Sequence, residues 1–156
     1  MPNWCDNKVK ITGPVDKLYN MAKAIEKDEL LQHIVPLAEW DYGEATSSWG
    51  TKWDISEGWC TPNEDYTELD VYFQTAWGPP NEAFVTYMSE NDDVEITLWY
   101  YEGGNDFCGI NEDERAQLPG YKDPLWDTDD VLKECDEVFG IRENMEEWEE
   151  WGEENA

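Results

Sequence analysis

A chain of 156 residues is long enough for one domain with a single hydrophobic core and too short for two domains of ordinary size. Hydrophobic residues make up 40% of it and include ten tryptophans, so the chain is able to collapse, yet 38 acidic residues against 10 basic ones give a net charge of −28. This charge excludes free nucleic acid and anionic membranes as ligands, because both are bound through clustered Lys and Arg. We therefore expect any partner to be basic.

The first elements in chain order are a strand and a helix. Val9 and Ile11 alternate within 7–12 as in a strand with one buried face, and Gly13-Pro14 ends it. Apolar residues then recur at the spacing of a helix with one buried face. They are Leu18, Met21, Ala22 and Ile25.

A hairpin, a second helix and a further strand follow. Residues 51–55 and 67–77 are predicted as two strands joined through 58–66. Pro79-Pro80 ends the second strand and starts a helix, and 94–100 alternates again as a strand. A short edge strand is possible at 107–110. The order βαββαβ indicates an α+β, ferredoxin-like fold: an antiparallel sheet with two helices.

Four sequence blocks resemble one known family. MPNWCDNKVKITG at 1–13, WGTKWDI at 49–55, TAWGPP at 75–80 and YYEGGNDFCG at 100–109 are similar to the YubB-like ferredoxin-like domain family of phage and plasmid proteins. The resemblance covers about 1–110 and implies a ferredoxin-like domain in a mobile-element setting, without a settled activity. The tryptophans of these blocks are expected to pack the sheet; alternatively, some of them line a family pocket. The residues of that pocket would be Trp49, Lys52, Trp53, Trp77 and Glu102.

The acidic charge is concentrated late in the chain. Residues 1–78 have a net charge of −8, whereas 79–156 have −20, of which −13 lies in 111–156. We therefore place a boundary near 110 and treat 111–156 as an acidic, mainly helical extension, packed on the first domain or projecting from it. Thr128 is predicted as the N-cap of one helix and Gly140 as its end. From 141 onwards, glutamates oppose an apolar stripe in a second, amphipathic helix.

No residue pattern in the chain indicates an enzyme, a metal or a cofactor. The single histidine, His33, has no nucleophile at a recognisable spacing, and Cys108 is expected to be a small buried residue. The sequence 127–138 begins like a calcium loop but has Leu132 where glycine is required. No signal peptide or membrane-spanning segment is visible, so we expect a protein of the bacterial host cytoplasm.

These observations lead to a functional hypothesis. We expect a non-enzymatic inhibitor, made by a phage or plasmid, that mimics DNA and blocks the basic DNA-binding groove of a host CRISPR effector or restriction enzyme. The partner-binding residues would be Asp127, Asp129, Asp130, Glu134, Glu137, Glu143, Glu146, Glu147, Glu150, Trp148 and Trp151.

Three alternatives stay open. The chain could be an inhibitor or adaptor that binds a protein through its tryptophan-rich face, with the acidity serving solubility. It could be an acidic protein of a salt-loving host. It could also be a small ligand-binding protein or enzyme with a pocket near His33, Trp49, Lys52 and Glu102.

Overall fold

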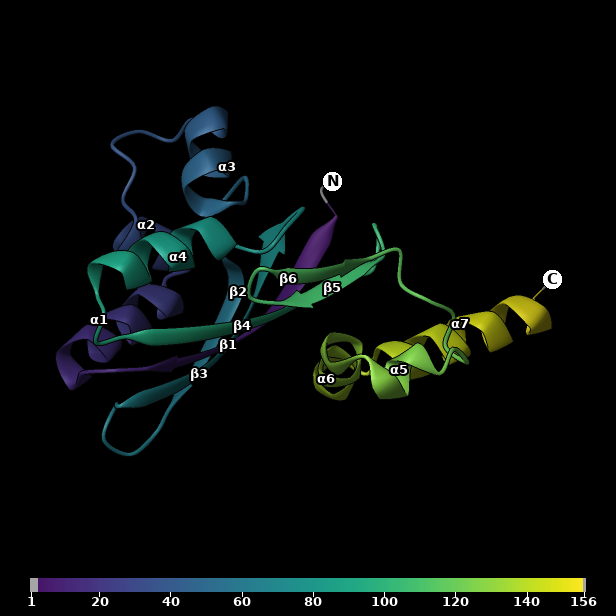
Figure 1. The fold of residues 1–156 in the computed structure, drawn as a ribbon. Coiled ribbons are helices and arrows are strands. Elements are labelled where there is room, and N and C mark those ends of the chain that lie inside the picture. The colour runs from purple at the N-terminus through teal and green to yellow at the C-terminus, as the bar shows by residue number, and fades with distance from the viewer. Residues whose placement is uncertain (1–2, 156) are drawn as a thin grey trace.

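The computed structural model describes residues 3–155, which form one six-stranded antiparallel sheet and seven helices (Figure 1). The predicted α+β class is confirmed. The strands are β1 (Trp4–Thr12), β2 (Ser56–Pro62), β3 (Glu68–Ala76), β4 (Glu95–Glu102), β5 (Phe107–Ile110) and β6 (Asp113–Ala116). The helices are α1 (Val15–Glu26), α2 (Leu30–Ile34), α3 (Tyr42–Trp49), α4 (Asn81–Glu90), α5 (Leu125–Thr128), α6 (Asp130–Phe139) and α7 (Ile141–Glu154). The strand order across the sheet is β2-β3-β1-β4-β5-β6.

One face of the sheet carries the main core. Val9 of β1 lies directly between Val71 of β3 and Leu98 of β4, and all three side chains are buried. Helices α1 and α4 supply the other side of this core through an apolar stripe each. The predicted α1 stripe of Leu18, Met21, Ala22 and Ile25 is fully confirmed as buried.

The strand predicted over 51–55 is wrong. Residues 51–54 form bends, and β2 begins only at Ser56 and runs to Pro62, into the segment 58–66 that was predicted to be the hairpin loop. The physical reason is the side chain of Asp54, which accepts hydrogen bonds from the backbone N–H groups of Leu31 and Gln32 at 2.9 Å each. These bonds cap α2, so the segment turns towards that helix instead of pairing in the sheet.

The second face of the sheet is covered over β4, β5 and β6 by the C-terminal helices. Tyr101 of β4 and Cys108 of β5 are direct cross-strand partners, and both contact the helices. The buried members of this second core are Cys108, Leu118, Trp126, Val131, Leu132, Cys135 and Ile141. Because β6 pairs with β5, the sheet itself runs across the predicted boundary at 110.

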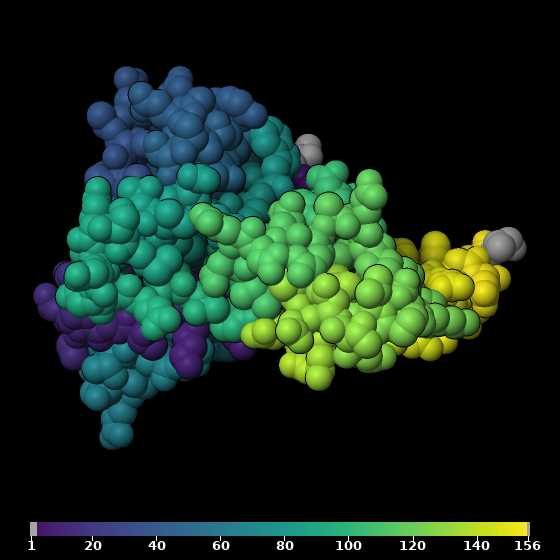
Figure 2. Space-filling view, in the orientation of Figure 1, coloured from purple at the N-terminus to yellow at the C-terminus, as the bar shows by residue number. Residues whose placement is uncertain are grey.

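From this second core, α7 runs outwards to the C-terminal end (Figure 1). The space-filling view shows the last helix protruding beyond the rest of the molecule (Figure 2). Within residues 3–155, no helix combines the length and the apolar character needed to cross a membrane.

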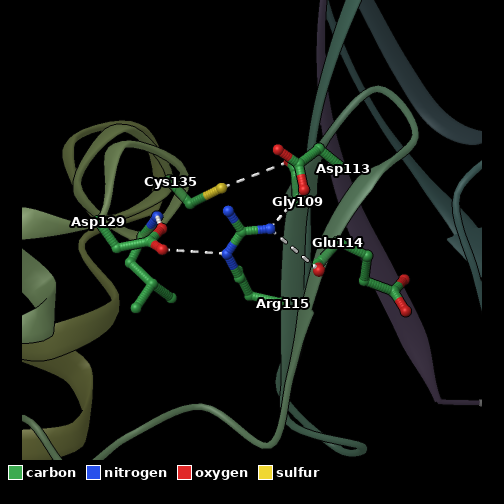
Figure 3. A network of polar contacts seen from close by, with 7 residues as sticks. Gly109, Asp113, Glu114, Arg115, Asp129 and Cys135 are labelled. Carbon is green, nitrogen blue, oxygen red and sulfur yellow. Dashed lines mark hydrogen bonds and ion pairs between the residues drawn. The ribbon is translucent and has the colours of Figure 1, made fainter.

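An arginine joins β6 to α6. Arg115 Nε donates to Asp129 Oδ2 at 3.1 Å, and the same guanidinium pairs with Asp113 (Figure 3). The other oxygen of Asp129 accepts from the backbone N–H of Leu132 at 3.0 Å. Asp129 is thus the N-cap of α6, and the prediction of Thr128 as that cap is wrong; Thr128 ends α5. The Leu132 N–H and Arg115 together lower the pKa of Asp129.

A second arginine fixes the start of α7. Arg142 Nε donates to the backbone carbonyl of Tyr121 at 2.9 Å, and its guanidinium also lies 3.2 Å from Asp127 Oδ1. The backbone N–H of Arg142 donates to Asp136 Oδ1 at 2.9 Å. Gly140, between α6 and α7, has a positive φ of 63°, and it ends α6 as predicted.

We predict that Trp126→Ala detaches the C-terminal helices. Trp126 is only 1% exposed, and truncating a buried tryptophan costs about 3–5 kcal/mol of unfolding free energy. Chemical denaturation measures the loss. Trp151→Ala is the matched control, because Trp151 is 59% exposed, and it should change the free energy of unfolding by less than about 0.5 kcal/mol. If the two variants lowered the free energy of unfolding equally, the second core would not be what holds the C-terminal helices.

We also predict that Asp129→Ala lowers the free energy of unfolding by about 1 kcal/mol, the usual effect of removing an N-cap. Because the folded-state pKa of Asp129 is lowered, its ionic contribution is present above the ordinary Asp pKa and is lost as the pH falls through the folded value. The difference in the free energy of unfolding between the native chain and the Asp129→Ala variant should therefore shrink below about pH 4. Asp130→Ala, at the exposed neighbouring position, is the control. If the loss of unfolding free energy in Asp129→Ala did not depend on pH, the ionised Asp129 carboxylate would not stabilise α6.

Candidate functional site

Three of the predicted partner-binding acids are engaged within the chain. Asp127 pairs with Arg142, and Asp129 pairs with Arg115 and caps α6. Glu134 accepts a hydrogen bond from the indole Nε1 of Trp99 at 2.9 Å. Asp129 and Glu134 hold α6 against the sheet and are only partly available to a partner, whereas Asp127 links α5 to α7 and stays exposed.

The glutamates of α7 have a different environment. Of the 14 residues of α7, only Ile141 is buried. The helix carries seven glutamates, all exposed, and none of them forms an ion pair with a basic side chain in residues 3–155. We call these residues the carboxylate face: Glu143, Glu146, Glu147, Glu149, Glu150, Glu153 and Glu154.

The carboxylate face occupies one side of α7. At about 100° per residue, the seven glutamates fall within roughly half of the helix circumference. Four of them were predicted as site residues. Glu149, Glu153 and Glu154 were not, although their helical positions alone place them on the same side.

The other side of α7 presents two tryptophans. Trp148 is 71% exposed and Trp151 is 59% exposed, and their rings meet edge to face with centroids 5.9 Å apart. Together with Glu147 they line a shallow hollow of about 510 Å³. Only the start of the predicted apolar stripe docks, through Ile141 and the partly buried Met145. Both tryptophans are therefore available to a partner.

The corner between α6 and α7 joins the carboxylate face to α6. A hollow of about 470 Å³ lies there, lined on its acidic side by Glu137, Glu143 and Glu146. Asp130, also predicted as a site residue, is exposed at the first turn of α6. The structure thus brings Glu137 together with α7, whereas Asp129 and Glu134 bond to the sheet and Asp127 lies exposed on α5 beside Arg142.

The predicted family pocket is assembled only in part. Lys52 lies between the rings of Trp53 and Trp77, with Nζ 4.5 and 4.8 Å from their centroids. Trp49 is instead a core residue, 3% exposed, whose Nε1 donates to the Val35 carbonyl at 2.8 Å. Glu102 is 1% exposed and accepts hydrogen bonds from the backbone N–H groups of Gly104 and Asn105. Its carboxylate closes the turn after β4.

The side chains considered for catalysis or ligand binding do not lie together in one site. His33 is exposed on α2 and lines a hollow with Lys23 and Lys27. No residue of the predicted family pocket lines this hollow. Cys108 is fully buried, as expected, beside Cys135. The neighbouring Cys108 thiol and burial raise the pKa of Cys135, which disfavours a reactive thiolate there. Within the described part of the chain, no three His, Cys, Asp or Glu side chains form a group that could hold a metal ion.

Comparison with known proteins gives a family and one related structure. No curated protein matches the chain significantly. A solved structure, the crystal structure of a protein Api92 from Yersinia pseudotuberculosis, has the same fold with a TM-score of 0.52 at 11% sequence identity. The alignment covers 77% of this chain and 99% of the Yersinia chain. At this identity, the likeness concerns the fold alone.

The family match includes most of the C-terminal extension. The model of the ferredoxin-like domain in Api92-like protein matches residues 41–151, from just before α3 to within α7. The part after 110, which lies outside the four sequence blocks, therefore falls inside the matched region. This confirms the ferredoxin-like domain, and the chain belongs to the family of Api92-like ferredoxin-like domains.

Proposed function

We propose that this protein is a non-enzymatic inhibitor, encoded by a phage or plasmid, that occupies the DNA-binding groove of a host defence nuclease. In this proposal, the carboxylate face of α7 takes the place of DNA phosphates in the groove of a CRISPR effector or restriction enzyme. The observation that carries the proposal is a projecting helix with seven exposed glutamates on one side, none of which forms an ion pair among the described residues.

The spacing of the charges supports DNA mimicry. A 14-residue helix is about 21 Å long, so seven carboxylates correspond to about one charge per 3 Å of axis. One strand of B-form DNA carries one phosphate per about 3.4 Å of axis. Neighbouring glutamates three or four positions apart have Cβ atoms about 5–6 Å apart. The charge density of the face is therefore close to that of a single DNA strand.

The anchoring of α7 supports a preformed binding element. Ile141 is buried, and Arg142 is held by Tyr121 and Asp127, so the first turn is fixed to the second core. A partner that binds an ordered helix does not have to order it, which reduces the entropic cost of association. Trp148 and Trp151 add apolar anchors beside the charges, of the residue type enriched in binding hot spots.

The experiment is a competition assay with fluorescently labelled duplex DNA. Purified restriction enzymes and RNA-guided nucleases bind their DNA in the presence of increasing amounts of this protein, and fluorescence anisotropy reports the bound fraction. We expect the DNA to be displaced from at least one of these nucleases in a saturable way, and free DNA to be unaffected. Absence of competition with every nuclease tested would reject DNA mimicry.

Charge reversal on α7 should abolish the competition. Replacing Glu143, Glu146, Glu147 and Glu150 with lysine places like charges against a basic groove, which costs several kcal/mol and hence at least about 100-fold in affinity. The control reverses four exposed glutamates outside the C-terminal helices α5, α6 and α7: Glu39, Glu64, Glu90 and Glu112. It makes the same change in net charge, so an equal loss in both variants would assign the effect to overall charge and not to α7.

The competition should also depend steeply on salt. Screening shortens the range of charge interactions from about 10 Å at 0.1 M salt to about 3 Å at 1 M. We expect the inhibition constant, measured in the same assay, to rise at least tenfold between 0.1 and 0.5 M salt. An inhibition constant that stays constant over this range would instead favour the alternative of binding through an aromatic face.

A further inference from the structure

Lys52 lies closer to two aromatic rings than Lys8, the other lysine with two ring contacts among the described residues. Its ammonium group is bracketed by two indole rings, at 4.5 Å from the Trp53 centroid and 4.8 Å from the Trp77 centroid. Both distances are within the range of cation–π attraction. The bracket holds the ammonium in place on a side chain that is only partly exposed.

In the part of the chain that the structure describes, the ammonium of Lys52 has no oxygen partner. Among the residues that the structure describes, no carboxylate oxygen lies within 4.0 Å of Lys52 Nζ, although the chain has 38 acidic residues. Two of the acids near Lys52 in sequence are used elsewhere. Asp54 caps α2, and Asp41 caps α3 by accepting from the Glu44 N–H at 3.0 Å. The three N–H donors of Lys52 are thus left for an acceptor from outside the chain.

Trp77, whose ring contacts the Lys52 ammonium, has an unfavourable backbone conformation. Trp77 has a φ of +71°, which is rare and unfavourable for a bulky residue. Its N–H donates to the Asn3 carbonyl at 2.8 Å, and Thr51 Oγ1 donates to the Ala76 carbonyl at 2.8 Å. These bonds fix the segments of Lys52 and Trp77 against each other. Strain that the surroundings maintain is typical of functional positions.

Further exposed aromatic side chains surround this bracket. Trp40 and Tyr42 are each about half exposed, at 51% and 50%. The indole Nε1 of Trp40 donates to the Lys52 carbonyl at 2.9 Å, and the Tyr42 ring lies 6.1 Å from that of Trp77. We call this patch the Lys52 surface: Trp40, Tyr42, Lys52, Trp53 and Trp77.

We propose that the Lys52 surface docks a protein segment that presents a carboxylate to the Lys52 ammonium, with apolar side chains on either side. Charge complementarity favours this partner, because the Lys52 ammonium at the centre of the surface has no oxygen acceptor among the described residues. Tryptophan and tyrosine around a central charge are the composition of binding hot spots. The surface is distinct from the carboxylate face, because α3 and α7 lie at opposite sides of the molecule (Figure 1). It also requires the opposite charge in its partner.

The test uses blocked tripeptides and nuclear magnetic resonance on the full-length labelled protein. Acetyl-Leu-Glu-Leu-amide is compared with the same peptide carrying Gln or Lys in the centre. We expect saturable shifts of the Lys52 ε-methylene and of the Trp53 and Trp77 indole N–H signals with the Glu peptide. The Gln peptide should bind at least fivefold more weakly, and the Lys peptide should produce no shift.

Two variants complete the test. Lys52→Met keeps an unbranched apolar stem and should reduce binding of the Glu peptide to the level of the Gln peptide, whereas Lys122→Met, at an exposed lysine beside Tyr121, should leave it unchanged. Equal binding of the Glu and Gln peptides would overturn the proposal. Stronger binding of the Lys peptide would also overturn it, because the rings would then be a cation site that Lys52 occupies. These peptide comparisons decide the matter on the native chain even if Lys52→Met fails to fold.

Discussion

The positions of two arginines determine how this acidic chain is arranged. The segment 111–156 has a net charge of −13 and has to pack against a domain that is itself negative. Arg115 pairs with Asp129 and so ties β6 to α6, Arg142 pairs with Asp127 and so ties α7 to α5, and a small apolar core lies beside them. The docking uses Asp127 and Asp129, and it leaves the glutamates of α7 without an ion pair in the described residues. The same interactions that fix α7 therefore keep its charges available.

Two surfaces of opposite chemistry follow from this arrangement. The carboxylate face gathers negative charge on a helix beyond the second core, and it fits a basic groove. The Lys52 surface presents a single cation among aromatic rings, and it fits a carboxylate. A protein with both could hold a basic nuclease at one side and a second protein segment at the other. The proposals are separate, since each depends on different residues and a different charge in the partner.

Periodicity predicted the elements that bury a regular apolar face, and it failed for the others. The apolar residues of α1 recur at helical spacing, and those of β3 and β4 occupy every second position. These three elements were therefore predicted from the sequence. β6 has the sequence DERA, which is almost entirely polar, and only its pairing with β5 makes it a strand. β2 has the sequence SEGWCTP, buries no residue fully and leaves Trp59 exposed, so it shows no apolar alternation. α3 buries only Ala45 and Trp49, too few for a visible stripe.

The candidate site was predictable where it depends on one helix and unpredictable where it depends on distant contacts. The glutamates of α7 share a side because of helical spacing alone. The use of Asp129 and Glu134 for docking depends on Arg115 and Trp99, which lie 14 and 35 positions away in the sequence. Likewise, the bracket around Lys52 forms only because the end of β3 folds back beside 51–54.

In the proposed complex, α7 occupies the position of a DNA strand in its partner. Hydrogen exchange of a nuclease that this protein inhibits is the decisive measurement, with the nuclease measured alone, with its duplex DNA and with this protein. We expect the same Lys- and Arg-rich segments of the nuclease to become protected by DNA and by this protein, and the α7 charge-reversal variant to remove only the second protection. Protection of segments that DNA leaves unaffected would contradict this position of α7.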